Sequence, residues 1–163
     1  MILIALGANL PGRFGSALAA CQFGLARLAE VPGLRVVGCS AFYRTAPVPA
    51  SDQPDFINAV AACTGDVAPD VLLAALHTIE AEAGRVRGMV NAARVLDLDL
   101  IDWHGVTREA PPPVLPHPRA HLRGFVLLPL REVAPDWRHP VSGETVTEMI
   151  DGLPGQEKER RLF

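Results

Sequence analysis

Residues 94–101 read RVLDLDLI, and this alternation of leucine and aspartate constrains the fold more than any other part of the chain. Successive side chains on a β-strand point to opposite faces, so the three leucines share one face and Asp97 and Asp99 share the other. The leucine face predicts packing against helices. The other face brings two carboxylates to roughly 7 Å between Cα atoms, where they repel and raise each other's pKa unless a cation lies between them.

The two aspartates therefore predict a site for hard cations. Two divalent ions roughly 3.5–4 Å apart fit such a pair, and this is the geometry of two-metal phosphoryl transfer. Ligands that are all oxygen favour Mg²⁺ over Zn²⁺. A simpler alternative stays open from these residues alone, in which Asp97 and Asp99 are solvated charges on an exposed strand face.

Local patterns divide the 163 residues into elements of one domain, residues 1–163. Helices are expected from Ser16, which can cap a first turn, and from Pro69, which suits a first helical position. The order β-α-β-β-α-β predicts an α+β fold with a ferredoxin-like arrangement, in which an antiparallel sheet carries helices on one face. The strands are expected at 2–7, 34–45, 55–63 and 94–103.

The last part of the chain is apolar but interrupted by proline. Pro129 breaks the run LRGFVLLPLREVAP at 122–135, so we expect short helical pieces there. Residues 144–151 predict a last short helix.

Composition excludes several classes of protein. The net charge of −3 argues against a nucleic-acid-binding surface, and no apolar run reaches membrane-spanning length. The start MILIALGANL has no basic region typical of a signal peptide. The three cysteines are widely spaced, which predicts buried free thiols in a reducing compartment. We therefore expect a cytoplasmic protein without nucleic-acid or membrane partners.

Three arginines surround the aspartates. Arg85 and Arg87 lie upstream, and Arg94 begins the strand. Their planar guanidinium groups match phosphate oxygens, although charge pairing with the two carboxylates is an open alternative. No G-x-x-x-x-G-K-[ST] motif occurs, so this is not a P-loop protein.

Phe56 and Asn58 are two residues apart and so share one strand face. An aromatic ring beside an amide suits a flat heterocycle, because the ring stacks and the amide reads hydrogen-bonding groups. The alternative is a core phenylalanine and a loop-capping asparagine. His117 and His121 are four apart, but Pro118 disfavours a helix that would carry them as a metal pair.

Six segments in order resemble one family, the 6-hydroxymethyl-7,8-dihydropterin pyrophosphokinases of folate biosynthesis. They are ALGANL at 5–10, FYRTAPV at 42–48, DQPDFINA at 52–59, GRVR at 84–87, RVLDLDLI at 94–101, and PH at 116–117 followed by RGFVLLPL at 123–130. The resemblance implies transfer of pyrophosphate from ATP to the hydroxymethyl group of the pterin. It also implies a monomeric enzyme whose partners are these two small molecules.

The resemblance further implies site residues. Asp97 and Asp99 would bind two Mg²⁺ ions and, with Arg85 and Arg94, form the catalytic set. The residues it places on ATP are Glu80, Arg85, Arg87, Arg94, Leu100, His117 and Arg123. Those it places on the pterin are Gly7, Thr45, Ala46, Pro47, Val48, Phe56, Asn58 and Phe125, with the ring between the two phenylalanines.

The segment 85–94, RVRGMVNAAR, lacks apolar periodicity and carries arginines. It therefore predicts a poorly anchored lid that closes over both substrates. Many members of the family carry a tryptophan in this segment, and this chain does not.

Two other classes compete with a pyrophosphokinase. An RNA-recognition domain needs exposed aromatic residues and a basic face on its central strands, whereas the strand at 94–103 carries acids. A metal-dependent phosphohydrolase could use the same two aspartates, but it has no need of the Phe56 and Asn58 pair. Consumption of ATP without a pterin would distinguish the hydrolase.

Overall fold

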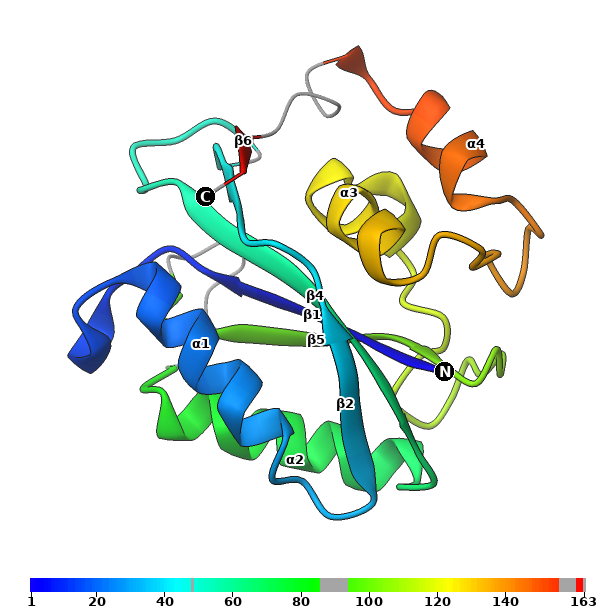
Figure 1. Cartoon of the computed structure of the whole chain (residues 1–163), viewed down its shortest axis with the longest axis horizontal. Coiled ribbons are helices and arrows are strands. Elements are labelled where there is room, and N and C mark those ends of the chain that lie inside the picture. The colour runs from blue at the N-terminus through cyan, green and yellow to red at the C-terminus, as the bar shows by residue number, and fades with distance from the viewer. Residues whose placement is uncertain (48, 86–93, 156–160, 163) are drawn as a thin grey trace.

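The computed structural model describes residues 1–47, 49–85 and 94–155, and the backbone of 161–162. The architecture is α+β: helices pack on an antiparallel sheet (Figure 1), as the sequence predicts. No helix in these described ranges has the length and apolarity needed to cross a membrane.

Strand β1 (Ile2–Ala8) lies inside the sheet, between β5 (Asp97–Trp103) and β4 (Phe56–Gly65), and is antiparallel to both. The order continues from β4 to β3 (Tyr43–Thr45) and the two-residue β6 (Arg161–Leu162). Strand β2 (Leu34–Cys39) pairs with the other end of β4. Strands β1 and β4 thus form the centre of the sheet, and β2, β3 and β5 each pair with one of them.

Four α-helices and two short 3₁₀ turns complete the described fold. Ser16 caps α1 (Ala17–Leu28), because its hydroxyl accepts a hydrogen bond from the Ala19 N–H. Helix α2 (Pro69–Glu82) begins at the predicted proline. The remaining elements are η1 (Gly12–Phe14), η2 (Ala120–Leu122), α3 (Gly124–Val133) and α4 (Val146–Asp151).

Helices cover both faces of the sheet, which corrects the expectation of helices on one face. Helices α1 and α2 pack on the face that carries Leu96, Leu98 and Leu100, and α3 and α4 pack on the opposite face (Figure 1). The reason lies in β1 and β4, whose consecutive apolar residues are buried on both sides. A strand with two apolar faces needs cover on both.

Three predicted boundaries are also wrong. The strand expected at 34–45 is two strands, because the Ser40 hydroxyl accepts the Val60 N–H between them. Strand β5 starts at Asp97 and not at residue 94, since the Arg94 carbonyl accepts hydrogen bonds from the loop after β1. Helix α3 continues through Pro129 as one helix. Burial of the apolar residues on either side of this proline outweighs the loss of one backbone hydrogen bond.

Candidate active site

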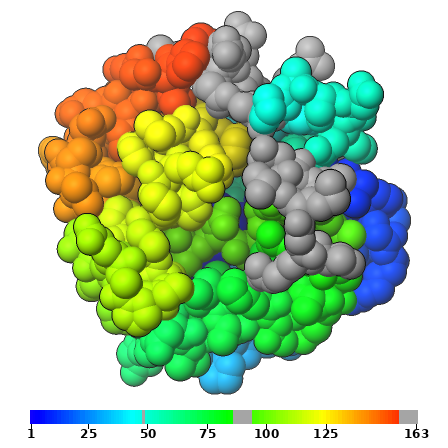
Figure 2. Space-filling view, turned by 180° about the vertical axis from the view of Figure 1, so that it is seen from behind, coloured from blue at the N-terminus to red at the C-terminus, as the bar shows by residue number. Residues whose placement is uncertain are grey.

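A cavity of about 720 Å³ opens on the face of the sheet that α3 covers in part. Figure 2 shows this side of the molecule, hollowed between α2 in green and the segment that leads into α3 in yellow. Residues from β1, β3, β4, α2, β5 and the start of α3 line it. The cavity therefore joins segments that are far apart in the sequence.

Strand register places the polar groups at the centre of this cavity. Gly7 of β1 pairs with Asn58 on one side and with Asp97 on the other, and Ala5 pairs with Asp99. Residues directly opposite in antiparallel strands share a face. The small residues of β1 therefore separate the amide on β4 from the carboxylates on β5 without filling the space between them.

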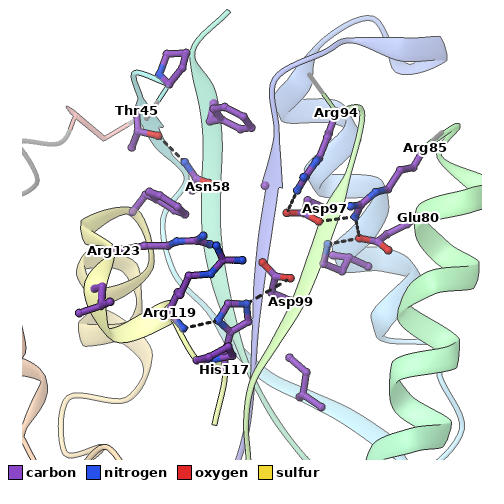
Figure 3. Close-up of a pocket in the computed structure, with 18 of the residues that line it drawn as sticks. Thr45, Asn58, Glu80, Arg85, Arg94, Asp97, Asp99, His117, Arg119 and Arg123 are labelled. Carbon is purple, nitrogen blue, oxygen red and sulfur yellow. Dashed lines mark hydrogen bonds and ion pairs between the residues drawn. The ribbon is translucent and has the colours of Figure 1, made fainter. Parts of the chain in front are cut away.

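The prediction that the aspartates and the leucines face opposite ways is confirmed. Leu96, Leu98 and Leu100 belong to the core under α1 and α2, whereas both carboxylates point into the cavity (Figure 3). Leu98 and Leu100 are also among the residues that line the cavity.

Two arginines meet at Asp97. Arg85 donates from Nη1 to Oδ1 of Asp97 and also to Glu80, and Arg94 donates from Nη1 to Oδ2 of Asp97 over 2.9 Å (Figure 3). Glu80 is only 2% exposed, and its Oε2 also accepts the Leu98 N–H over 2.9 Å. Burial raises the pKa of Glu80 to about 7, against the opposing effects of the Leu98 N–H and Arg85. The site is thus a network of two carboxylates and two guanidinium groups.

Asp99 faces a second basic group. Burial, and then repulsion from Asp97, raises the pKa of Asp99 to about 6. His117 Nε2 lies 4.0 Å from Asp99 Oδ1, while His117 Nδ1 accepts the Arg119 N–H over 3.1 Å. Burial and the nearby Arg123 lower the pKa of His117 to about 4. A neutral His117 with its proton on Nε2 therefore presents a donor toward Asp99.

The residues that flank η2, just before α3, bring further cations to the same place. Arg119 and Arg123 point toward Asp99 from the side opposite Arg85 and Arg94 (Figure 3). The Arg123 guanidinium carbon lies 5.5 Å from the centre of the Phe125 ring. Basic groups from two sides thus surround the carboxylates, an arrangement that suits a polyanion carrying bound cations.

An aromatic and amide wall lies on the β3 and β4 side. Phe56, Asn58 and Phe125 all line the cavity, with the backbone of Thr45–Pro47 beside them. Asn58 is 6% exposed and donates from Nδ2 to Oγ1 of Thr45 over 2.7 Å. This hydrogen bond holds the Asn58 amide in place, so its remaining atoms are fixed relative to the two rings.

The cavity brings together every predicted site residue that the structure describes. Val48 and Arg87 fall outside the described residues, as do residues 86–93 of the predicted lid. Sequence reasoning missed other lining residues, among them Leu73 of α2, Gln53 and Pro112–Val114. The prolines at 111–113 carry no signal in the sequence that this segment reaches a site.

Asp97 and Asp99 are the candidate cation ligands. Within the described ranges, no group of three or more histidine, cysteine or acidic side chains could hold a metal ion. His121, which stands four residues after His117, packs its ring against His139 instead, with centres 4.6 Å apart. Two carboxylates still fit Mg²⁺, which commonly uses one or two carboxylates and takes its other ligands from substrate phosphates and water.

The sequence also matches a known protein family and several named proteins. Residues 3–135 match the family model described as 7,8-dihydro-6-hydroxymethylpterin-pyrophosphokinase. A 2-amino-4-hydroxy-6-hydroxymethyldihydropteridine pyrophosphokinase from Synechocystis is 39% identical over 88% of this chain and 73% of its own length. Proteins of the same name from Methylorubrum extorquens and Pseudomonas aeruginosa are 39% and 36% identical, over 96% and 98% of this chain and 96% and 95% of their own lengths.

Proposed function

The chain belongs to the 7,8-dihydro-6-hydroxymethylpterin-pyrophosphokinase family, and we propose that its cavity holds ATP and the pterin on either side of Asp97 and Asp99. The protein is a transferase that moves pyrophosphate from ATP to hydroxymethyldihydropterin in folate synthesis. The observation that carries the proposed arrangement is the strand register, which sets Asn58 and Asp97 on opposite sides of Gly7.

Asp97 and Asp99 are the proposed ligands of two Mg²⁺ ions. The pKa of Asp99, raised by burial and then by repulsion from Asp97, supports this role, because a bound cation offsets both effects. Held there together with ATP, such ions would supply positive charge against the phosphate oxygens. A strand is a suitable support for such ligands, since its backbone hydrogen bonds to β1 fix their spacing.

The triphosphate would lie among the basic side chains that converge on the aspartates. Arg85 and Arg94 approach from one side and His117 and Arg123 from the other. Phosphoryl transfer depends on positioning and charge stabilisation more than on covalent catalysis. These four groups can supply both, and no general base is assigned.

The pterin would lie between Phe56 and Phe125, with Asn58 and the backbone beside Thr45 reading its edge. Stacking on two rings would bury the faces of the pterin, and the fixed amide of Asn58 would select the pterin by hydrogen bonds to its edge. Asn58 is on β4, and Asp97 and Asp99 are on β5, with Gly7 of β1 between the two strands. The pterin ring and the pyrophosphate that is transferred to it would therefore meet over β1.

The nucleoside would occupy the opposite end of the cavity. To this end we assign the lining residues Leu73 and Glu80 of α2, Leu100 of β5 and the segment Pro112–Val114. Apolar side chains with a few polar groups are typical of a site for an aromatic base. Because Glu80 already bonds to Arg85 and Leu98, its proposed effect on the nucleotide is exerted at least in part through Arg85.

Several coarser features fit this function. Strand order β5-β1-β4-β2, with α1 and α2 on one face, supports a ferredoxin-like core within a single domain. Free Cys21, Cys39 and Cys63 support a reducing, cytoplasmic location. A monomer without nucleic-acid or membrane partners stays a prediction.

One assay tests the proposed use of both substrates. Purified protein is incubated with ATP and Mg²⁺, with and without 6-hydroxymethyl-7,8-dihydropterin, and AMP is measured. We expect AMP in the complete mixture alone. Consumption of ATP without the pterin would point to a phosphohydrolase, and absence of AMP from the complete mixture would contradict the transfer.

A further inference from the structure

Two consecutive prolines and a valine form one wall of the cavity. Pro112, Pro113 and Val114 line it together with Leu73 and Leu100. Pro113 is buried, whereas Val114 keeps 42% of its surface exposed. The segment therefore presents an apolar surface at the end of the cavity that we assign to the nucleoside.

Prolines cannot donate backbone hydrogen bonds, so Pro112 and Pro113 offer no N–H groups to hold this wall. Arg108 supplies donors in their place. Its Nε donates to the Pro111 carbonyl over 2.7 Å, and its Nη2 donates to the Pro112 carbonyl over 3.1 Å. A planar guanidinium with fixed donors suits two successive carbonyls.

The backbone of Arg108 fixes the other end of the same segment. Arg108 and Leu115 form an isolated antiparallel bridge, in which each N–H donates to the other's carbonyl over 2.8 Å. Leu115 is buried in the core below the leucine face of β5. Arg108 thus closes a loop around residues 109–114 through both its backbone and its side chain.

We propose that Arg108 is a positioning residue for the nucleotide, which holds the Pro112–Val114 wall in the shape that packs against the base of ATP. Arg108 is not among the residues that line the cavity in the described ranges, so its effect must pass through the wall. The inference rests on the proposed function, because it requires the base to occupy this end. It adds a residue that no sequence motif marks.

A general structural role for Arg108 makes a different prediction from a positioning role. If the guanidinium merely stabilises the fold, its loss should weaken all ligands in proportion to the loss of folded protein. If it positions the wall, its loss should weaken ligands that carry the base and spare the phosphates, which are held by other arginines. The affinity of the protein for a ligand that carries the base falls in proportion to the fraction of molecules whose Pro112–Val114 wall has the shape that binds the base.

Arg138 provides a matched control. It forms the same kind of isolated bridge, with Thr145, and its Nη1 donates to the Gly143 carbonyl over 3.1 Å. None of these three residues lines the cavity. Arg138→Met therefore removes a comparable loop brace away from the site.

The test compares the full-length wild type, Arg108→Met, Arg108→Lys and Arg138→Met. Calorimetric titrations with Mg²⁺ use two probes, a non-hydrolysable ATP analogue and inorganic triphosphate, which lacks the base. We expect Arg108→Met to raise the Kd of the ATP analogue about threefold to tenfold, as when the competent wall falls to a third or a tenth of the population. The Kd of triphosphate should change less than twofold, and Arg138→Met should bind both probes like the wild type.

Steady-state kinetics give a second readout. Arg108→Met should raise the KM for ATP and leave kcat within about twofold, and Arg108→Lys, which keeps one donor, should recover part of the affinity. An unchanged Kd for the ATP analogue, or an equal loss for both probes, would overturn the positioning role while leaving the proposed function intact. Failure of the wild type to bind the ATP analogue would overturn both. If Arg108→Met does not fold, Arg108→Lys decides by the same comparison of probes.

Discussion

Gly7 stands directly between Asn58 and Asp97 in the sheet, paired with one on each side, and a Cβ at Gly7 would lie 3.1 Å from Asn58 Oδ1. Glycine suits this position because the side-chain amide of Asn58, which we assign to the pterin, lies close above the backbone of β1 and leaves little room for a Cβ. This contact links the backbone of β1 to the specificity of the site. It also makes the role of Asn58 testable without changing Asn58 itself.

Gly7→Ala should therefore displace the Asn58 amide by a few tenths of an ångström. We expect the KM for the pterin to rise on the order of threefold to tenfold, because small misplacements of binding groups reduce productive geometry. The affinity for ATP should stay nearly unchanged. Gly38→Ala in β2 is the control, since a Cβ there meets no atom within 4 Å. A normal KM for the pterin in folded Gly7→Ala would contradict the assignment of Asn58.

Phe56→Ala and Asn58→Ala should weaken the pterin directly. Stacking of a base on an aromatic side chain is worth roughly 1–3 kcal/mol by alanine substitution, and loss of Asn58 also releases its bond to Thr45. Calorimetric titration with the pterin and, separately, with an ATP analogue measures the two sites independently. Equal losses for both ligands would indicate a damaged core and not a pterin wall.

Asp97→Asn and Asp99→Asn should leave the fold intact and lower turnover by on the order of 10²–10³, the loss typical of removing one group that stabilises transition-state charge. The measurement is kcat in purified protein whose circular dichroism matches the wild type. Near-normal kcat in either variant would remove that residue from the proposed metal site.

Asp102→Asn is the matched control on the same strand. Asp102 is 3% exposed, and its carboxylate accepts hydrogen bonds from Trp137 Nε1 over 2.8 Å and the Gly105 N–H over 3.1 Å. Its contacts are with the protein itself, so the substitution should lower the melting temperature and leave kcat close to the wild type. A drop in kcat as large as that of the Asp97 variant would show that charge anywhere on β5 matters.

The period of a β-strand was enough to predict that Asp97 and Asp99 share a face, because that property is local to five residues. Strand register is not local, so the placement of Gly7 between the two halves of the site could not be read from the chain. Cover on both faces of the sheet was missed for a related reason. The continuous apolar runs in β1 and β4 carried the signal, but the expected connectivity suggested cover on one face alone.

Ion pairs between elements that are distant in the chain also could not be predicted from the sequence. Three arginines near two aspartates predicted either charge pairing or phosphate binding, and the structure shows pairing of Arg85 and Arg94 with Asp97. Phosphate binding is compatible with this pairing, because an arginine can exchange one anionic partner for another. The partnership of Arg85 with the buried Glu80 depends on how α2 packs beside β5.

Arg85→Ala should lower turnover more than it weakens the binding of ATP. Arg85 already donates to Asp97 and Glu80, so a ground-state contact with a phosphate exchanges one anionic partner for another and adds little net affinity. Negative charge that develops on the phosphate during transfer strengthens its contact with Arg85, but not the contacts of Arg85 with Asp97 and Glu80. The contribution of Arg85 is therefore larger in the transition state than in the ground state, and its loss appears in kcat. We expect kcat to fall on the order of 10²–10³ and the Kd of an ATP analogue to rise less than about tenfold.

Arg13→Ala is the control, because Arg13 is exposed, donates to the Glu82 carbonyl and does not line the cavity. A loss of ATP affinity as large as the loss of kcat would instead make Arg85 a simple binding residue.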